Sequence, residues 1–198
     1  MRLQEKRTKD RRIQKTQKLL HEALYSLIHE KDYDAIAVKE ILDRANVGRS
    51  TFYTHFGDKD ELLVWGMHDM LRAVQSAERP SSAKPYERII WFSLPIFEHI
   101  SHHRLAGKAN LGARGRAIVH GHLQSVVAEL IAGDVKKCFQ GGRKAAGRIP
   151  PDIVVQFIAS TFILVLNWWV ESRNPLPPDA INSVFRALVV PTLTANLG

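Results

Sequence analysis

The residues best suited to bind a polyanion lie in one short run, GRSTFYTHFGDK. Arg49 can donate two hydrogen bonds to the edge of a guanine, and the hydroxyl groups of Ser50 and Thr54 can bond a base edge or a phosphate. Tyr53 and His55 offer further donors to phosphate oxygens. Side chains of these types, packed into a few residues, predict contact with a nucleic acid.

These residues must be positioned by helices. Apolar residues recur with a period near 3.6 along the chain, and alternating strand patterns are nearly absent, so the sequence predicts an all-α protein. Asn46 and Gly57 favour helix ends, and Asp58 with Glu61 forms a pattern that opens a helix. The helices expected in the first part of the chain span residues 11–30, 38–45, 49–55 and 59–78.

Two short helices joined by a three-residue turn are typical of a helix-turn-helix motif, whose second helix can enter the major groove of DNA. The second short helix separates into two faces. Val47, Phe52 and Phe56, with the methyl group of Thr51, can pack on the neighbouring helices, and the polar residues then face outward. The alternative interpretation is a solvated surface turn.

Charge supports a polyanionic partner. The net charge is +8, and residues 1–20 hold eight Lys or Arg against two Asp or Glu. Lys39 and Lys59 are expected in the first turns of two helices, where free backbone N–H groups already favour a phosphate. The basic start of the chain has no apolar signal-peptide core, so the expected location is the cytoplasm, on the nucleoid. The single cysteine, Cys138, excludes an intramolecular disulfide.

The run VKEILDRANVGRSTFYTHFGDKDELL resembles the DNA-binding head of the tetracycline-repressor-like (TetR) family of bacterial regulators. The matching positions, within a resemblance that covers about residues 11–65, are Val38, Ile41, Ala45, Val47, Thr51, Tyr53, His55, Phe56, Lys59 and Leu62. Ile36 and Ala37 depart from the pattern, because similar proteins usually carry Ser or Thr there, and Gly48 stands where Ser is common. A side-chain cap and a phosphate contact at 36 and 37 are therefore not expected.

The resemblance implies a helix-turn-helix domain at residues 1–58 and a helical ligand-binding and dimerisation domain at 59–198, with helix 59–78 connecting them and about nine helices in all. The residues expected to contact DNA are Lys39, Gly48, Arg49, Ser50, Thr51, Tyr53, Thr54, His55 and Lys59. Further helices are expected at residues 85–102, 104–111, 115–138, 151–172 and 178–195, separated by loops at 141–151 and 173–179 and preceded by a Pro/Ser linker at 78–85.

The last two expected helices resemble the pair that forms a four-helix dimer bundle in this family. The segment 153–170 is apolar nearly all round, so it needs partners on two sides. A membrane span is the alternative for this segment, but four polar residues interrupt it, and burial in protein is favoured. The expected homodimer contacts are Phe157, Thr161, Val165, Trp168, Ile181, Val184, Phe185 and Leu188.

Aromatic residues in the second domain can supply the lining of an apolar pocket for a small molecule, and a packed core is the alternative interpretation for most of them. The expected lining is Phe92, Ile96, His99, His103, Phe162 and Trp169. His99 and His103 also have a spacing that can hold a metal, but no carboxylate or cysteine partner accompanies them, so we predict neither a metal nor a cofactor.

The sequence as a whole predicts a ligand-responsive regulator that binds a double-stranded DNA operator as a homodimer, most simply a repressor released by an unknown small molecule. An activator of the same fold is the alternative within this class. An enzyme with a fused helix-turn-helix is the alternative outside it. No nucleophile elbow, phosphate-binding loop or carboxylate pair supports an enzyme, and no membrane partner is expected.

Overall fold

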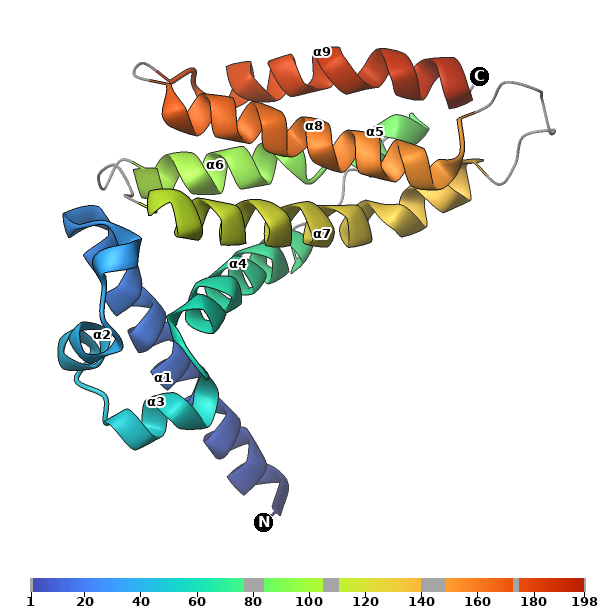
Figure 1. Ribbon diagram of the computed structural model, residues 1–198. Helices are drawn as coiled ribbons and strands as arrows, with labels where there is room; N and C mark the ends of the chain where they lie inside the picture. The colour runs from blue at the N-terminus through green and yellow to red at the C-terminus, as the bar shows by residue number, and fades with distance from the viewer. Residues whose placement is uncertain (1, 77–83, 105–110, 140–148, 173–174, 198) are drawn as a thin grey trace. The chain divides into compact units, whose positions relative to one another are not determined.

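The computed structural model describes residues 2–76, 84–104, 111–139, 149–172 and 175–197, and the regular elements in these ranges are all helical (Figure 1). They are α1 Arg2–Glu30, the 3-10 turn η1 Tyr33–Ala35, α2 Val38–Ala45, α3 Arg49–His55, α4 Lys59–Ser76, α5 Pro85–Ile90, α6 Ser93–Arg104, α7 Gly112–Phe139, α8 Pro151–Glu171 and α9 Pro178–Leu197. The expected linker, most of the helix expected at 104–111 and most of the loop expected at 141–151 lie outside the described residues.

The chain forms two compact units. The first, here called the head, comprises Met1–Asp69 and Arg104–Val119, and the second, the body, comprises Met70–His103 and His120–Gly198. The start of α4 and the first turns of α7 therefore pack with the helix-turn-helix motif. Helix α7 begins in the head and continues in the body.

The head is built around one apolar cluster. Helix α1 contributes the face formed by Leu20, Ala23, Leu24, Leu27 and Ile28, which follows helical spacing. Tyr33, Ile41, Phe52 and Leu62 complete the cluster from the other elements, and each is fully buried.

The end of α2 sets the turn of the motif. Asn46 has φ 51° and ψ 47°, which is the left-handed conformation expected for it, and its N–H donates to the carbonyls of Asp43 and Leu42. The N–H of Val47 donates to Leu42 O at 3.1 Å. This stop confirms the bounds predicted for both short helices, because it ends α2 three residues before α3 begins.

The body differs from expectation at residues 85–102, where two helices replace one. The break lies at Trp91 and Phe92, just before Pro95 in the first turn of α6. In a continuous helix the ring of Pro95 would clash with the carbonyl of Trp91, so the chain must start a new helix there. At the break, Ser93 Oγ lies 2.8 Å from Ile90 O and 2.7 Å from Asn182 Oδ1 of α9.

Helix α8 is long and apolar enough to cross a membrane, but half of its apolar window is buried inside the protein. Nine of its residues are buried, and it lies beside α9 (Figure 1). Burial on one side and apolar exposure on the other fit a core helix that also has an outer contact face.

Candidate nucleic-acid interface

Helix α3 separates into the two faces expected from its sequence. Phe52 is fully buried and Phe56 is 4% exposed, and their ring centroids lie 5.8 Å apart in the head cluster. The polar residues of α3 predicted to meet DNA are all exposed except His55, which is half-buried: Arg49, Ser50, Thr51, Tyr53 and Thr54. Thr51 thus differs from the expectation that its methyl group packs inward. One side of α3 therefore exposes hydrogen-bonding groups to solvent, and the other side packs in the apolar cluster of the head.

Two contacts order this face. The Arg49 guanidinium lies 5.8 Å from the centroid of the Tyr53 ring, within range of a cation–π interaction. The hydroxyl of Thr54 donates to the carbonyl of Ser50 at 2.9 Å, so its oxygen remains available mainly as an acceptor. Gly48 is the exposed N-cap residue of α3 and provides no side-chain cap.

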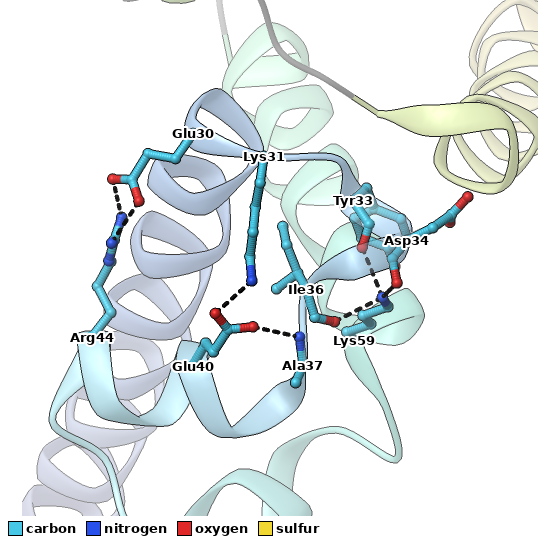
Figure 2. Close-up of polar contacts among 9 residues, drawn as sticks. All are labelled: Glu30, Lys31, Tyr33, Asp34, Ile36, Ala37, Glu40, Arg44 and Lys59. Carbon is cyan, nitrogen blue, oxygen red and sulfur yellow. Dashed lines mark hydrogen bonds and ion pairs between the residues drawn. The ribbon is translucent and has the colours of Figure 1, made fainter.

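The start of α2 is capped from within the helix. Ala37 cannot cap it, but Glu40 Oε2 accepts the Ala37 N–H at 2.9 Å, which is one half of a capping box. Lys31 donates to the other oxygen of Glu40 at 2.5 Å (Figure 2). This hydrogen bond with Lys31, together with the Ala37 N–H, lowers the pKa of Glu40. Lys39, predicted to meet a phosphate, is exposed beside this cap.

Helices α1 and α2 are held together by Arg44. Its guanidinium forms two hydrogen bonds to the Glu30 carboxylate, at 2.5 and 2.8 Å (Figure 2). A third hydrogen bond joins it to Ser26 Oγ at 2.8 Å. The bidentate geometry fixes the angle of α2 better than a lysine would. Because α3 follows α2 after three residues, this contact also bears on the orientation of α3.

Lys59, which was predicted to bind a phosphate, has its ammonium group at the loop between α1 and α2. Its ammonium group donates to three backbone carbonyls, Tyr33 O at 2.7 Å, Asp34 O at 3.2 Å and Ile36 O at 2.8 Å (Figure 2). It also lies 4.5 Å from the Tyr33 ring centroid. An ammonium has three protons, and all three are used within the head. Burial lowers the pKa of Lys59, and the nearby carboxylates of Asp60 and Asp34 act in the opposite direction.

Asp60 links the same loop to the first turn of α7. Its Oδ1 accepts the Tyr33 hydroxyl at 2.5 Å, and its Oδ2 accepts Arg114 Nη2 at 2.5 Å. Burial alone would raise the pKa of Asp60, but the hydrogen bonds from Tyr33 and Arg114 and the charge of Lys59 leave it lowered. Burial, with the Asp60 contact, raises the pKa of Tyr33. No local pattern in the sequence indicates this junction, because Tyr33, Asp60 and Arg114 are far apart in the chain.

Glycine permits the approach of α7. Gly112 has φ +58°, and a Cβ there would lie 2.4 Å from Asp32 Oδ1. At Gly115 a Cβ would lie 3.0 Å from the Tyr33 ring. A larger residue at either position would push α7 away from the loop that Asp60 and Lys59 hold.

A shallow groove of about 430 Å³ lies beside the end of α3, lined by His55, Phe56, Asp58, Asp60, Glu61, Val64, Trp65 and His68. Asp58 and Glu61 also cap α4, since Asp58 Oδ1 accepts the N–H groups of Asp60 and Glu61, as their spacing predicted. Three carboxylates in the groove oppose a phosphate there. Among the described residues, no group of three or more His, Cys, Asp and Glu side chains could hold a metal ion.

The aromatic residues predicted to line a ligand pocket are part of the packed core of the body. Phe92, Ile96, Phe162 and Trp169 are at most 1% exposed, and the Phe92 and Phe162 ring centroids lie 5.1 Å apart. The indole N–H of Trp169 donates to Leu176 O at 2.7 Å. His99 is half-buried, and the side chain of His103 lies outside the described part of the chain. Burial raises the pKa of the Cys138 thiol, which opposes a reactive thiolate.

An exposed apolar face runs along α8 and α9. Five of the eight residues predicted for a dimer contact are at least partly exposed: Phe157, Thr161, Trp168, Val184 and Leu188. Val165, Ile181 and Phe185 are 0–5% exposed and pack in the protomer's own core, which corrects their assignment. Ile153 and Leu164, which the prediction omitted, are 58% and 67% exposed. Seven of the ten large apolar side chains that are exposed in the described part of the chain lie on these two helices, and their outer surface is here called the α8–α9 face.

These features define a helix-turn-helix DNA-binding protein with a helical second unit. Residues 20–64 match the bacterial regulatory proteins of the tetR family, and residues 89–190 match a transcriptional regulator C-terminal region of the same family. The chain belongs to the TetR family of transcriptional regulators, which bind DNA and respond to ligands.

Curated relatives agree with this assignment. The chain is 40% identical over 55 residues to the HTH-type transcriptional regulator YxbF of Bacillus subtilis and 38% identical over 50 residues to the dhaKLM operon transcriptional activator DhaS of Lactococcus lactis. These matches cover 27% and 25% of this chain, but only 14% and 27% of the two relatives. The regulator YhgD of B. subtilis matches over 90% of this chain and 97% of its own length, at 25% identity.

Solved structures share the fold. A TetR transcriptional regulator from Streptococcus agalactiae is 25% identical, with a TM-score of 0.59 over 92% of this chain and 97% of its own. The structure of RolR, solved with resorcinol, is 18% identical, with a TM-score of 0.55 over 92% of this chain and 89% of its own. Both confirm the all-α fold class predicted from the sequence.

Proposed function

We propose that this regulator represses transcription as a homodimer bound to a palindromic operator. The observation that carries the proposal is the exposed face of α3, on which Arg49 and Tyr53 adjoin three hydroxyl-bearing side chains above a buried Phe52. Two such helices in a symmetric dimer would enter successive major grooves about 34–36 Å apart.

Arg49 is the proposed base-reading residue, because its guanidinium can bind the O6 and N7 atoms of one guanine at once. Arg49→Ala should weaken operator binding by about 1–3 kcal/mol and relax the sequence preference at one base pair of each half-site. Selection of binding sites from random duplexes, followed by titration of wild type and variant, measures both effects. An unchanged affinity and an unchanged site preference would remove Arg49 from this role.

The α8–α9 face is the proposed dimer contact. Leu164 and Leu188 are 67% and 48% exposed, and large apolar faces of this kind mark protein interfaces. Leu164→Glu should therefore give a folded monomer in sedimentation velocity, whereas Glu171→Gln at the end of the same helix should leave the dimer intact. A dimer that persists with a glutamate at both 164 and 188 would contradict the assignment.

Release from DNA by a small molecule bound in the body completes the proposal. A ligand can shift the regulator away from DNA only by its difference in affinity for the two states. A transcriptional activator is the second candidate function, because DhaS, which is similar to this chain over 50 residues, is named as an activator. A reporter gene placed behind the selected operator separates the two, because its expression rises or falls when the regulator is deleted. We place the protein in the cytoplasm, where its DNA is.

A further inference from the structure

Helix α1 is much longer than the head requires. Among the residues of α1 whose side chains the structure describes, 11–30, the first buried one is Leu20, and 18 helical residues, 2–19, precede it. The four basic side chains described in this stretch are all exposed: Arg11, Arg12, Lys15 and Lys18. None of the four forms an ion pair with a described carboxylate. Ile13 is half-buried and Leu19 is exposed, so little apolar packing holds this segment.

Such a segment is a poor helix by itself. A helix that is polar all round gains almost nothing from packing, and most helical stability in proteins comes from packing. Arg11 and Lys15 are four residues apart, and Lys15 and Lys18 are three apart, so like charges face one another along one side. A polyanion that lies along the segment would remove this repulsion.

We infer that residues 2–19 of α1 form an arm that lies along duplex DNA and binds phosphates flanking the half-site read by α3. The inference rests on the proposed function, because it needs α3 on DNA. Leu20, the residue that follows the arm, belongs to the same apolar cluster as Phe52 of α3, so the arm joins the head at the cluster on which α3 packs. In Figure 1, α1 continues beyond α3 to the N-terminus.

The length of the arm sets its reach. Eighteen residues at 1.5 Å each span about 27 Å, which corresponds to roughly eight base pairs of 3.4 Å. The contacts are to phosphates, so the arm should add affinity without adding sequence preference. It should also add salt dependence, at about 0.9 in the slope of log K against log salt for each phosphate contact.

The test compares two variants that lose the same charge. Arg11→Gln with Lys15→Gln changes the arm, and Lys136→Gln with Lys137→Gln changes two exposed lysines in the last turn of α7. Glutamine keeps the helix propensity of both sites. Each protein is titrated with the selected operator, cut to its core or extended by eight base pairs on each side, at several salt concentrations.

The arm variant should lower the salt slope by about 2 per protomer on the extended duplex, should lose the affinity gained from the flanks, and should keep the wild-type site preference. The control variant should match wild type in all three. Amides of residues 2–19 in the wild type should also exchange more slowly on the extended duplex than on the core duplex.

Equal slopes for the arm variant and wild type would overturn the inference, as would flanks that add no affinity in the wild type. Binding to phosphatidylglycerol vesicles that depends on Arg11 and Lys15, with no effect of these residues on extended DNA, would assign the arm to a membrane surface instead. Failure of the proposed function looks different, because no duplex would then be selected over random sequence.

Discussion

Replacing Lys59, at the start of α4, distinguishes a structural role in the head from the phosphate contact predicted from the sequence. Lys59→Met keeps the aliphatic stem and removes the ammonium group. The carbonyls of Tyr33 and Ile36 would lose donors at 2.7 and 2.8 Å, while that of Asp34 is exposed and can bond water instead. Two partly buried bonds from a charged donor are worth about 1.5 kcal/mol each.

We therefore expect Lys59→Met to lower the stability of the head by about 3 kcal/mol. For a unit of this size, that loss lowers the melting temperature of the head by roughly 12–24 °C. Circular dichroism measures the melting, and hydrogen exchange should show faster exchange of the α2 amides. Below the melting transition, the slope of log K against log salt for DNA binding should match that of wild type, because the three protons of the Lys59 ammonium are donated to carbonyls of the head.

Lys39→Met is the matched control, since Lys39 is exposed and also lies in a first turn. It should leave stability within about 0.5 kcal/mol of wild type and lower the salt slope by about 0.9 per protomer. The reasoning is refuted if Lys59→Met melts like wild type and lowers the salt slope as Lys39→Met does, because Lys59 would then be a phosphate ligand.

Two further perturbations test the head. Asp60→Asn should destabilise the protein at neutral pH and weaken the dependence of its stability on pH in acid. The pKa of Asp60 is lower in the folded state than in the unfolded state, where it is about 3.9. Its contribution to stability is therefore present above about pH 3.9 and is lost as the pH falls through the folded pKa. Melting temperatures between pH 7 and 3 measure this, and parallel curves for both proteins would contradict it. Asn46→Ala should cost about 1 kcal/mol in urea denaturation, because alanine is strained at φ 51°, whereas Asn46→Gly should be neutral or stabilising.

Local signals made the helix-turn-helix motif predictable. The predicted bounds of α2 and α3 agree with the structure. Asn46 ends α2 in the left-handed conformation that it favours, whereas α3 ends at Phe56 in an extended conformation, and Gly57, expected to stop α3, has no positive φ. The outward face of α3 could also be predicted, since Phe52 and Phe56 determine which side of the helix is buried. In each case the residues that decide the structure lie within a few positions of the structure they decide.

Partners distant in the chain were not predictable. Lys59 bonds carbonyls 23–26 residues away, and backbone carbonyls leave no trace in a sequence. Arg114 meets Asp60 across 54 residues. The face of α8 that turns outward was also ambiguous, because a helix apolar all round gives no sign of which side packs on its own chain. Val165 was therefore assigned to the dimer contact, and Leu164, the exposed residue beside it, was missed.

In the proposed complex, different basic residues of the head would supply sequence specificity and general affinity for DNA. The three ammonium protons of Lys59 are donated to backbone carbonyls, and Lys31 is paired with Glu40, so both charges are already engaged within the head. Within α2 and α3, Arg44 is paired with Glu30, so the exposed positive charges left to meet DNA are those of Lys39 and Arg49. One of them is proposed to read a base, which leaves little charge there for general affinity. The basic arm of α1 would supply it, and specificity and affinity would then reside on different helices and change independently under mutation.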